Sequence, residues 1–211
     1  MHQDVVHYLS VGALLGISAG LAPGPLLALV ISETLRHGVQ AGVRIAFAPV
    51  LTDLPIILAT WFLVSGLADF HPVLGVISLL GAAFVFSMGY EGLRTTGIDV
   101  SSAEGPAKSL TKGVLANFLS PHPYLFWFGV GAPIMSEASA ASAAAPWVFV
   151  VSFYLLLVGS KLALALIAGR SRSYLNGRVY RNLMRLLGLL LMLLAGLLAR
   201  DGLELLGLIG G

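Results

Sequence analysis

Two proline-bracketed segments lie inside long apolar stretches of the chain, and their residue types could build a ligand site. Pro23-Gly24-Pro25 lies in the first apolar stretch, and Pro121-His122-Pro123 lies in a later one. Each proline lacks a backbone N–H and clashes with the preceding turn, so two prolines one residue apart must interrupt a helix. At membrane depth, an interrupted helix is tolerated only where it lines a cavity or packs against protein. We therefore expect both breaks to face the protein interior.

The breaks would free backbone carbonyls and amides, and the N-terminus of each following half-helix carries a partial positive charge. A carboxylate or another anionic group is a natural ligand for such ends, and matching breaks in two halves of a chain indicate a transporter's substrate site. The alternative is that both segments are kinks whose freed groups are satisfied by neighbouring helices.

Asp53 and Lys161 are charged residues inside apolar stretches. An ionisable group at membrane depth costs about 2.5–3.5 kcal/mol on insertion scales and is a functional candidate by default. Asp53 could bind a substrate ammonium or carry a proton. The alternative is a static ion pair between Asp53 and Lys161, and the two interpretations are compatible.

Polar side chains surround the second break. His122 could relay a proton or contact a ligand, because histidine changes charge near neutral pH, but it could equally be a hydrogen-bonded core residue. Asn117 precedes the break and Tyr124 follows it. The aromatic run 126–128 is expected to pack against lipid or neighbouring helices.

The composition indicates an integral membrane protein. Of 211 residues, 57% are hydrophobic and 10% charged, whereas soluble domains are about one-quarter charged; the mean hydropathy is +0.92. The absence of cysteine excludes disulfides and thiolate metal sites, and no cofactor is implied. The arginines are confined to a few loops and form no basic face for nucleic acid.

Crossing the hydrocarbon takes about 20 apolar residues, and the sequence predicts six transmembrane helices in an all-α fold. Residues 1–10 contain no Lys or Arg, and the apolar run after them is too long for a signal peptide, so we expect the first helix to be retained. The sixth span is short unless Arg185 and Arg200 snorkel at its ends. The predicted spans are about 6–32, 45–68, 72–93, 113–135, 146–168 and 186–206.

Loop charge predicts the orientation. Apart from Lys161 and Arg200, every Lys and Arg lies in the first, third or fifth connection. The positive-inside rule therefore places these connections in the cytoplasm and both termini outside the cytoplasmic membrane. The run from Arg170 to Arg185 is interpreted as a topology signal and a contact for anionic head groups.

The polar segment 97–111 is predicted to be a cytoplasmic linker between two three-helix halves, 1–96 and 112–211. Three is an odd number, so the second half enters the membrane from the opposite side. Because the breaks fall in helices one and four, we predict a 3+3 inverted-topology repeat. Glycines spaced by four residues, such as Gly12, Gly16 and Gly20, permit close helix approach.

Several of these segments together are similar to the LysE/RhtB family of amino-acid exporters. The similarity lies in Gly16-x3-Gly20-x2-Pro23-Gly24-Pro25, the basic glycine-containing loop 35–42, the pair Thr52-Asp53, and the segment 113–125. Length, six spans and the basic connection before the last helix also fit. The resemblance implies export of amino acids or related small polar metabolites, driven by protons or the membrane potential.

The chain departs from the family pattern at three places. Ser120 stands where the family usually has Asn, which weakens the expectation of a direct contact there. Phe126 stands where exporters of basic amino acids tend to have Asp, which argues against lysine or arginine as substrate. Pro49 and Pro55 flank Asp53 atypically. These departures indicate a divergent member with a different substrate.

We therefore predict a secondary transporter, not an enzyme, with alternating access around a midplane site and with a small molecule and protons as partners; a homodimer is left open. Asp53 and Lys161 are assigned to proton or charge coupling. The predicted substrate-binding residues are Gly20, Pro23, Gly24, Pro25, Asn117, Ser120, Pro121, His122, Pro123 and Tyr124.

Two other functions are alternatives to a secondary exporter of small metabolites. The first is a metal or inorganic-ion exporter of a related superfamily, but the spans hold no cysteine, histidine-rich loop or carboxylate cluster to coordinate a cation. The second is a membrane-embedded hydrolase that uses Ser120, His122 and Asp53 as a triad. No Gly-x-Ser-x-Gly turn supports it.

Overall fold

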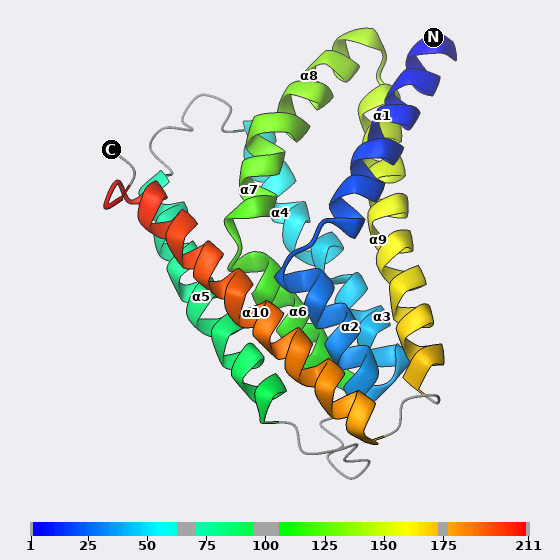
Figure 1. Ribbon diagram of the computed structural model, residues 1–211. Coiled ribbons are helices and arrows are strands. Elements are labelled where there is room, and N and C mark those ends of the chain that lie inside the picture. The colour runs from blue at the N-terminus through cyan, green and yellow to red at the C-terminus, as the bar shows by residue number, and fades with distance from the viewer. Residues whose placement is uncertain (1, 63–70, 95–105, 173–176, 210–211) are drawn as a thin grey trace.

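The computed structural model describes residues 2–62, 71–94, 106–172 and 177–209, and regular structure within these ranges is helical. The first part of the chain forms α1 (His2–Leu21), α2 (Pro25–His37), α3 (Val39–Ala46), α4 (Ala48–Phe62) and α5 (His71–Leu93). The second part forms α6 (Pro106–Phe118), α7 (Pro121–Phe126), the π-helical turn η2 (Trp127–Gly131), α8 (Ala132–Ala141), α9 (Ala145–Arg172) and α10 (Gly177–Leu205) (Figure 1).

Four segments are long and apolar enough to cross a membrane, namely Val39–Leu58, Pro72–Leu93, Ala145–Ser171 and Arg178–Leu205. The pair α1–α2, bent by 62°, would be a fifth span. The predicted fourth span is divided among α6, α7, η2 and α8, and none of these alone reaches the length of a crossing. By length and composition, the described residues thus show four or five spans, and the six-span repeat stays a prediction.

The chain is interrupted at both proline segments, as predicted. Gly24 is extended (φ −164°, ψ 174°) and Pro25 begins α2. Ser120 is extended as well (φ −102°, ψ 136°) and Pro121 begins α7. A proline is well placed at the start of a helix, because its missing N–H would have no helical acceptor there.

The helix bounds differ from the predicted spans in places. α6 begins at Pro106, so residues 106–111 are helical although we predicted them as part of the linker; a proline at the first helical position explains the early start. α9 and α10 each extend beyond the predicted crossings. The end of the predicted second span and the rest of the linker fall at residues 63–70 and 95–105, outside the described residues.

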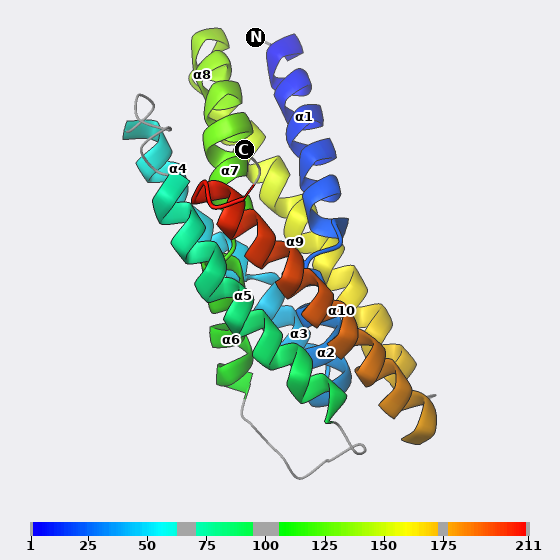
Figure 2. The same ribbon diagram turned by 60° about the vertical axis from the view of Figure 1, so that its left-hand side comes forward.

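Two closely packed helix pairs dominate the architecture: α1 lies along α9, and α5 lies along α10 (Figures 1 and 2). A Cβ atom added to Gly12 would lie 2.5 Å from the carbonyl oxygen of Phe149, and one added to Gly89 would lie 2.7 Å from that of Gly188. Glycines therefore allow the backbones to approach directly. Each pair joins a helix of the first part of the chain to a helix of the second part.

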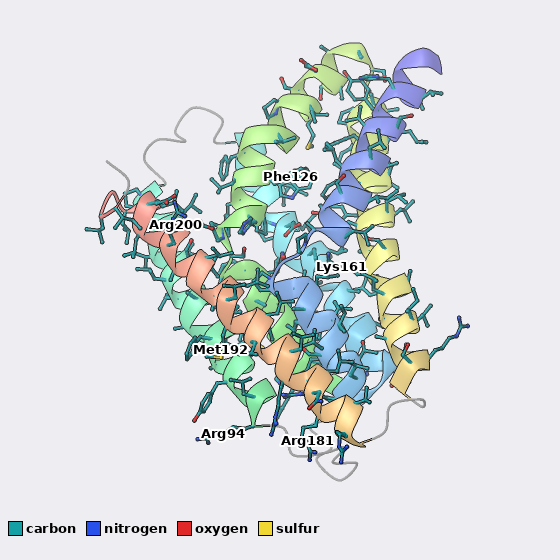
Figure 3. All side chains as sticks on the ribbon, viewed as in Figure 1. Arg94, Phe126, Lys161, Arg181, Met192 and Arg200 are labelled. Atoms are coloured by element: carbon teal, nitrogen blue, oxygen red, sulfur yellow. The ribbon has the colours of Figure 1, made fainter. Side chains whose placement is uncertain are left out.

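The labelled arginines lie toward two opposite ends of the molecule (Figure 3). α5 ends and α10 begins at the end where Arg94 and Arg181 lie, whereas Arg200 lies near the other end of α10 (Figure 3). α1 begins and α10 ends away from the Arg94 end (Figures 1 and 2). This arrangement agrees with the predicted grouping of the loops, while the orientation in a membrane stays a prediction.

Candidate functional site

A cavity of about 520 Å³ lies at the two breaks. Its walls come from α1, α2, α4, α6, α7, η2, α9 and α10, and Figure 3 labels two lining residues from different helices, Phe126 and Lys161. The predicted site residues that line it are Pro23, Gly24, Pro25, Asp53, Asn117, Ser120, His122, Pro123 and Lys161. The structure thus brings most of the predicted residues together, with Gly20, Pro121 and Tyr124 outside the cavity lining.

At the first break, Lys161 bonds to the freed backbone of α1. Its Nζ donates hydrogen bonds to the carbonyl oxygens of Gly20 at 2.9 Å and Ala19 at 3.4 Å. In a continuous helix these oxygens would accept from the amides of Gly24 and Pro23, but proline has no N–H and Gly24 is extended. The buried ammonium therefore replaces the helical donors that the break removes, and Gly20 contributes its carbonyl group.

At the second break, Tyr124 replaces a lost helical donor, as Lys161 does at the first. Its hydroxyl donates to the carbonyl oxygen of Phe118 at 3.0 Å. Ser120 Oγ accepts from the amide of His122 at 3.4 Å and lies 3.0 Å from His122 Nδ1. Pro121 is buried as the first residue of α7, and like Pro123 it carries no N–H. The one amide among these prolines is thus already bonded, so Pro121–Pro123 offer no free backbone donor to an anion.

The first break differs in this respect. The first amide of α2 with a backbone partner is that of Ala28, which donates to Gly24 at 3.1 Å. The amides of Leu26 and Leu27 precede it and have no helical acceptor, and no side chain caps the helix start. Both residues line the cavity, so the positive end of α2 is the anion-attracting part of the site.

Asp53 is 4% exposed and accepts hydrogen bonds from several helices. Its Oδ1 accepts from Asn117 Nδ2 at 2.8 Å and from Thr52 Oγ1 at 3.1 Å. Its Oδ2 accepts from Tyr154 Oη at 3.2 Å and from Trp127 Nε1 at 3.5 Å. The single hydroxyl hydrogen of Thr52 can instead bond to the carbonyl oxygen of Ala48, also at 3.1 Å, so Asn117, Tyr154 and Trp127 are the donors that Asp53 does not share with the backbone of its own helix. Asp53 therefore ties α4 to α6, η2 and α9.

The alternative of a static ion pair between Asp53 and Lys161 is wrong for the described residues. No ion pair joins them; Asp53 accepts from uncharged donors, and Lys161 donates to backbone carbonyls. The physical reason is that each charge has other partners on neighbouring helices. Lys161 bonds to carbonyl oxygens that the first break leaves without amide donors, and Asp53 bonds to side-chain donors such as Asn117 and Tyr154.

Sequence reasoning missed Trp127 and Tyr154 as partners of Asp53. Trp127 is fully buried, as expected of a packing residue, but its indole also donates to the carboxylate and its ring stacks on Tyr154. A Cβ added to Gly131 would collide with the Trp127 ring, so this glycine makes room for it. Tyr154 lies seven residues before Lys161, about two turns along one helix face, and that spacing was an available signal.

The positions of these side chains also test the hydrolase and the metal-exporter alternatives. Ser120 and His122 contact each other, but Asp53 contacts neither of them, so the described residues assemble no Ser-His-Asp triad. Over the same part of the chain, no group of three or more His, Cys, Asp or Glu side chains is placed to hold a metal ion.

Interrupted apolar helices around a largely apolar cavity that contains buried charged side chains are typical of an all-helical membrane transporter. Residues 17–202 match the family model described as LysE type translocator. The chain belongs to this family, as the Pro-Gly-Pro segment and the 113–125 segment indicated. The family consists of transporters, not enzymes. No curated protein and no solved structure matches the chain.

Proposed function

We propose that this chain is a secondary active exporter of amino acids or related small polar metabolites across the cytoplasmic membrane. The observation that carries the proposal is the cavity at the α1–α2 break, which combines a buried ammonium with the open N-terminus of α2 in a LysE type translocator. Such a site suits a small solute that carries a carboxylate.

The carboxylate of the solute would bind between Lys161 and the start of α2. An ammonium has three N–H donors, and two of those on Lys161 reach Ala19 and Gly20, which leaves one for a ligand. The amides of Leu26 and Leu27 supply further donors at the positive end of a helix. A carboxylate would thus meet both a charge and oriented dipoles.

Asp53 is the proposed coupling group. A protonated carboxyl oxygen becomes a donor, so a proton on Asp53 would displace at least one of the donors that Asn117, Trp127 and Tyr154 now supply. Protonation would therefore loosen the contacts of α4 with α6, η2 and α9. This is a physical route from proton binding to helix movement.

We propose six spans arranged as a 3+3 inverted repeat with both termini outside, and anionic head groups as partners of Arg170–Arg185. Alternating access would then move helix pairs: α1 packs on α9 and α5 on α10 through glycine contacts that a sliding motion would break. Each of these pairs joins a helix of one sequence half to a helix of the other. The helix pairs, and not the three-helix halves, would therefore move as rigid bodies.

The test is efflux from proteoliposomes loaded with a radiolabelled mixture of the twenty amino acids, with and without an imposed proton gradient. We expect gradient-dependent loss of one or a few amino acids, and none from liposomes that carry Lys161→Met. If neither these amino acids nor related small polar metabolites loaded in the same way move under either condition, the proposal is lost. An Asp53→Asn variant with unchanged pH dependence would remove Asp53 from coupling, and growth under metal stress tests the ion-exporter alternative.

A further inference from the structure

Asp201 is a second carboxylate that lines the cavity. It lies in the last span, α10, on one helix face with Leu194, Leu197 and Leu198, and all four residues line the cavity. Their spacing of three, four and seven residues is that of a single helical stripe. The adjacent Gly202 packs against α5, since an added Cβ would lie 3.0 Å from the carbonyl oxygen of Gly75. That contact holds the stripe toward the cavity.

Asp201 has unused acceptor capacity. Among the residues that the structure describes, none donates a hydrogen bond to it or forms an ion pair with it. The nearest cation along the chain, Arg200, is 67% exposed and pairs with Glu204 at 2.8 Å. Asp201 is partly exposed at the cavity, and a cation placed beside its carboxylate would gain a charge-assisted hydrogen bond.

The other charges of the cavity are already committed. Asp53 accepts hydrogen bonds from Asn117, Trp127 and Tyr154, and Lys161 gives two of its three N–H groups to carbonyls. A ligand with a positive group therefore finds one carboxylate with room for it, and that carboxylate is Asp201.

We propose that Asp201 selects the transported solute by its positive charge and accepts its ammonium group, while the solute's carboxylate lies toward Lys161 and the start of α2. This inference rests on the proposed function and deepens it, because it moves ammonium recognition from Asp53, where the sequence suggested it, to α10. The solute class is then one with separate ammonium and carboxylate groups. Hydroxy acids of the same shape bind more weakly, because they have no ammonium group.

The experiment compares L-leucine with its α-hydroxy analogue, L-2-hydroxy-4-methylpentanoate, and repeats the comparison for each amino acid that the wild type moves. In Asp201→Asn we expect the KM for the amino acid to rise about tenfold, as for loss of one charge-assisted hydrogen bond, and that for the hydroxy acid to stay unchanged. Glu204→Gln is the matched control on the same helix, because Glu204 pairs with Arg200 outside the cavity lining, and it should change neither value.

Equal discrimination in Asp201→Asn and wild type overturns the proposal. Absence of any amino-acid transport by the wild type would instead defeat the proposed function, so ligand binding is measured separately as a shift of the thermal unfolding midpoint with n-butylamine against n-butanol. Stabilisation by the amine alone, lost in Asp201→Asn, supports the role of Asp201; an unchanged response overturns it. Asp201→Ser provides a second neutral variant if the Asn variant does not fold.

Discussion

Lys161 Nζ donates a hydrogen bond to the carbonyl oxygen of Gly20 at 2.9 Å, across 141 positions of sequence. The contact joins the middle of α9 to the last turn of α1, where the proline break leaves carbonyls without amide donors. A cation at a helix C-terminus also compensates the helix dipole. The break and the lysine thus stabilise each other.

Lys161→Met should therefore destabilise the protein as well as abolish transport. The variant leaves the Gly20 and Ala19 carbonyls buried without donors, and we expect a loss of about 1–3 kcal/mol in the free energy of unfolding. Thermal unfolding in detergent measures the loss. Arg185→Met on the exposed surface of α10 is the control, with an expected change within about 0.5 kcal/mol. Equal unfolding midpoints for the two variants would contradict the capping role.

Asp53→Asn should be destabilising by about 2 kcal/mol, because an amide nitrogen would replace one acceptor oxygen and face donors such as Asn117 or Trp127. Trp127→Phe removes one of those donors. We therefore expect the double variant to lose less than the sum of the single losses, with a coupling of about 0.5–3 kcal/mol. A double-mutant cycle by thermal unfolding checks this, and strict additivity would show that the indole–carboxylate contact is energetically irrelevant.

Gly16→Ala should weaken the α1–α9 pair. The added Cβ would collide with the carbonyl oxygen of Phe153 and lie 3.0 Å from its Cα, and backbone atoms cannot move aside easily. We expect a loss of about 1–3 kcal/mol, as for other overpacked contacts. Gly159→Ala is the matched control on α9, since nothing lies within 4 Å of its added Cβ. It should be neutral or gain up to about 1 kcal/mol from helix propensity; similar losses at both sites would refute the close contact.

Glu33 forms a buried link between α2 and α6. It is 2% exposed and accepts hydrogen bonds from Lys112 Nζ and Ser109 Oγ, each at 3.1 Å. Glu33→Ala removes one partner of a buried ion pair and should cost about 3–5 kcal/mol. Glu91→Ala is the comparison: Glu91 is 57% exposed and 3.7 Å from Arg36, so about 0–1 kcal/mol is expected. Thermal unfolding midpoints of the two variants decide between these values, and equal losses would contradict the buried link.

The sequence predicted where most of the site lies along the chain. Pro23 and Pro121 indicated where the helices break, and Asp53 and Lys161 were recognisable as charges within apolar stretches. Their partners were not predictable, because Tyr154 and Trp127 reach Asp53 from helices distant in sequence and carry no signature of that contact. Asp201 and Glu33 went unnoticed for a related reason: both lie near the ends of apolar stretches, where a charged residue is ordinarily in water.

The sequence by itself determined the membrane class, the family and the positions of the two breaks, since hydropathy and the missing N–H of proline act locally, whatever the rest of the chain does. Only the tertiary structure decided that Lys161 caps α1 instead of pairing with Asp53, and that Asp53 accepts from donors on three other helices while no described residue donates to Asp201. Which donor meets which acceptor depends on how helices far apart in the chain pack, and glycine contacts at α1–α9 and α5–α10 set that packing.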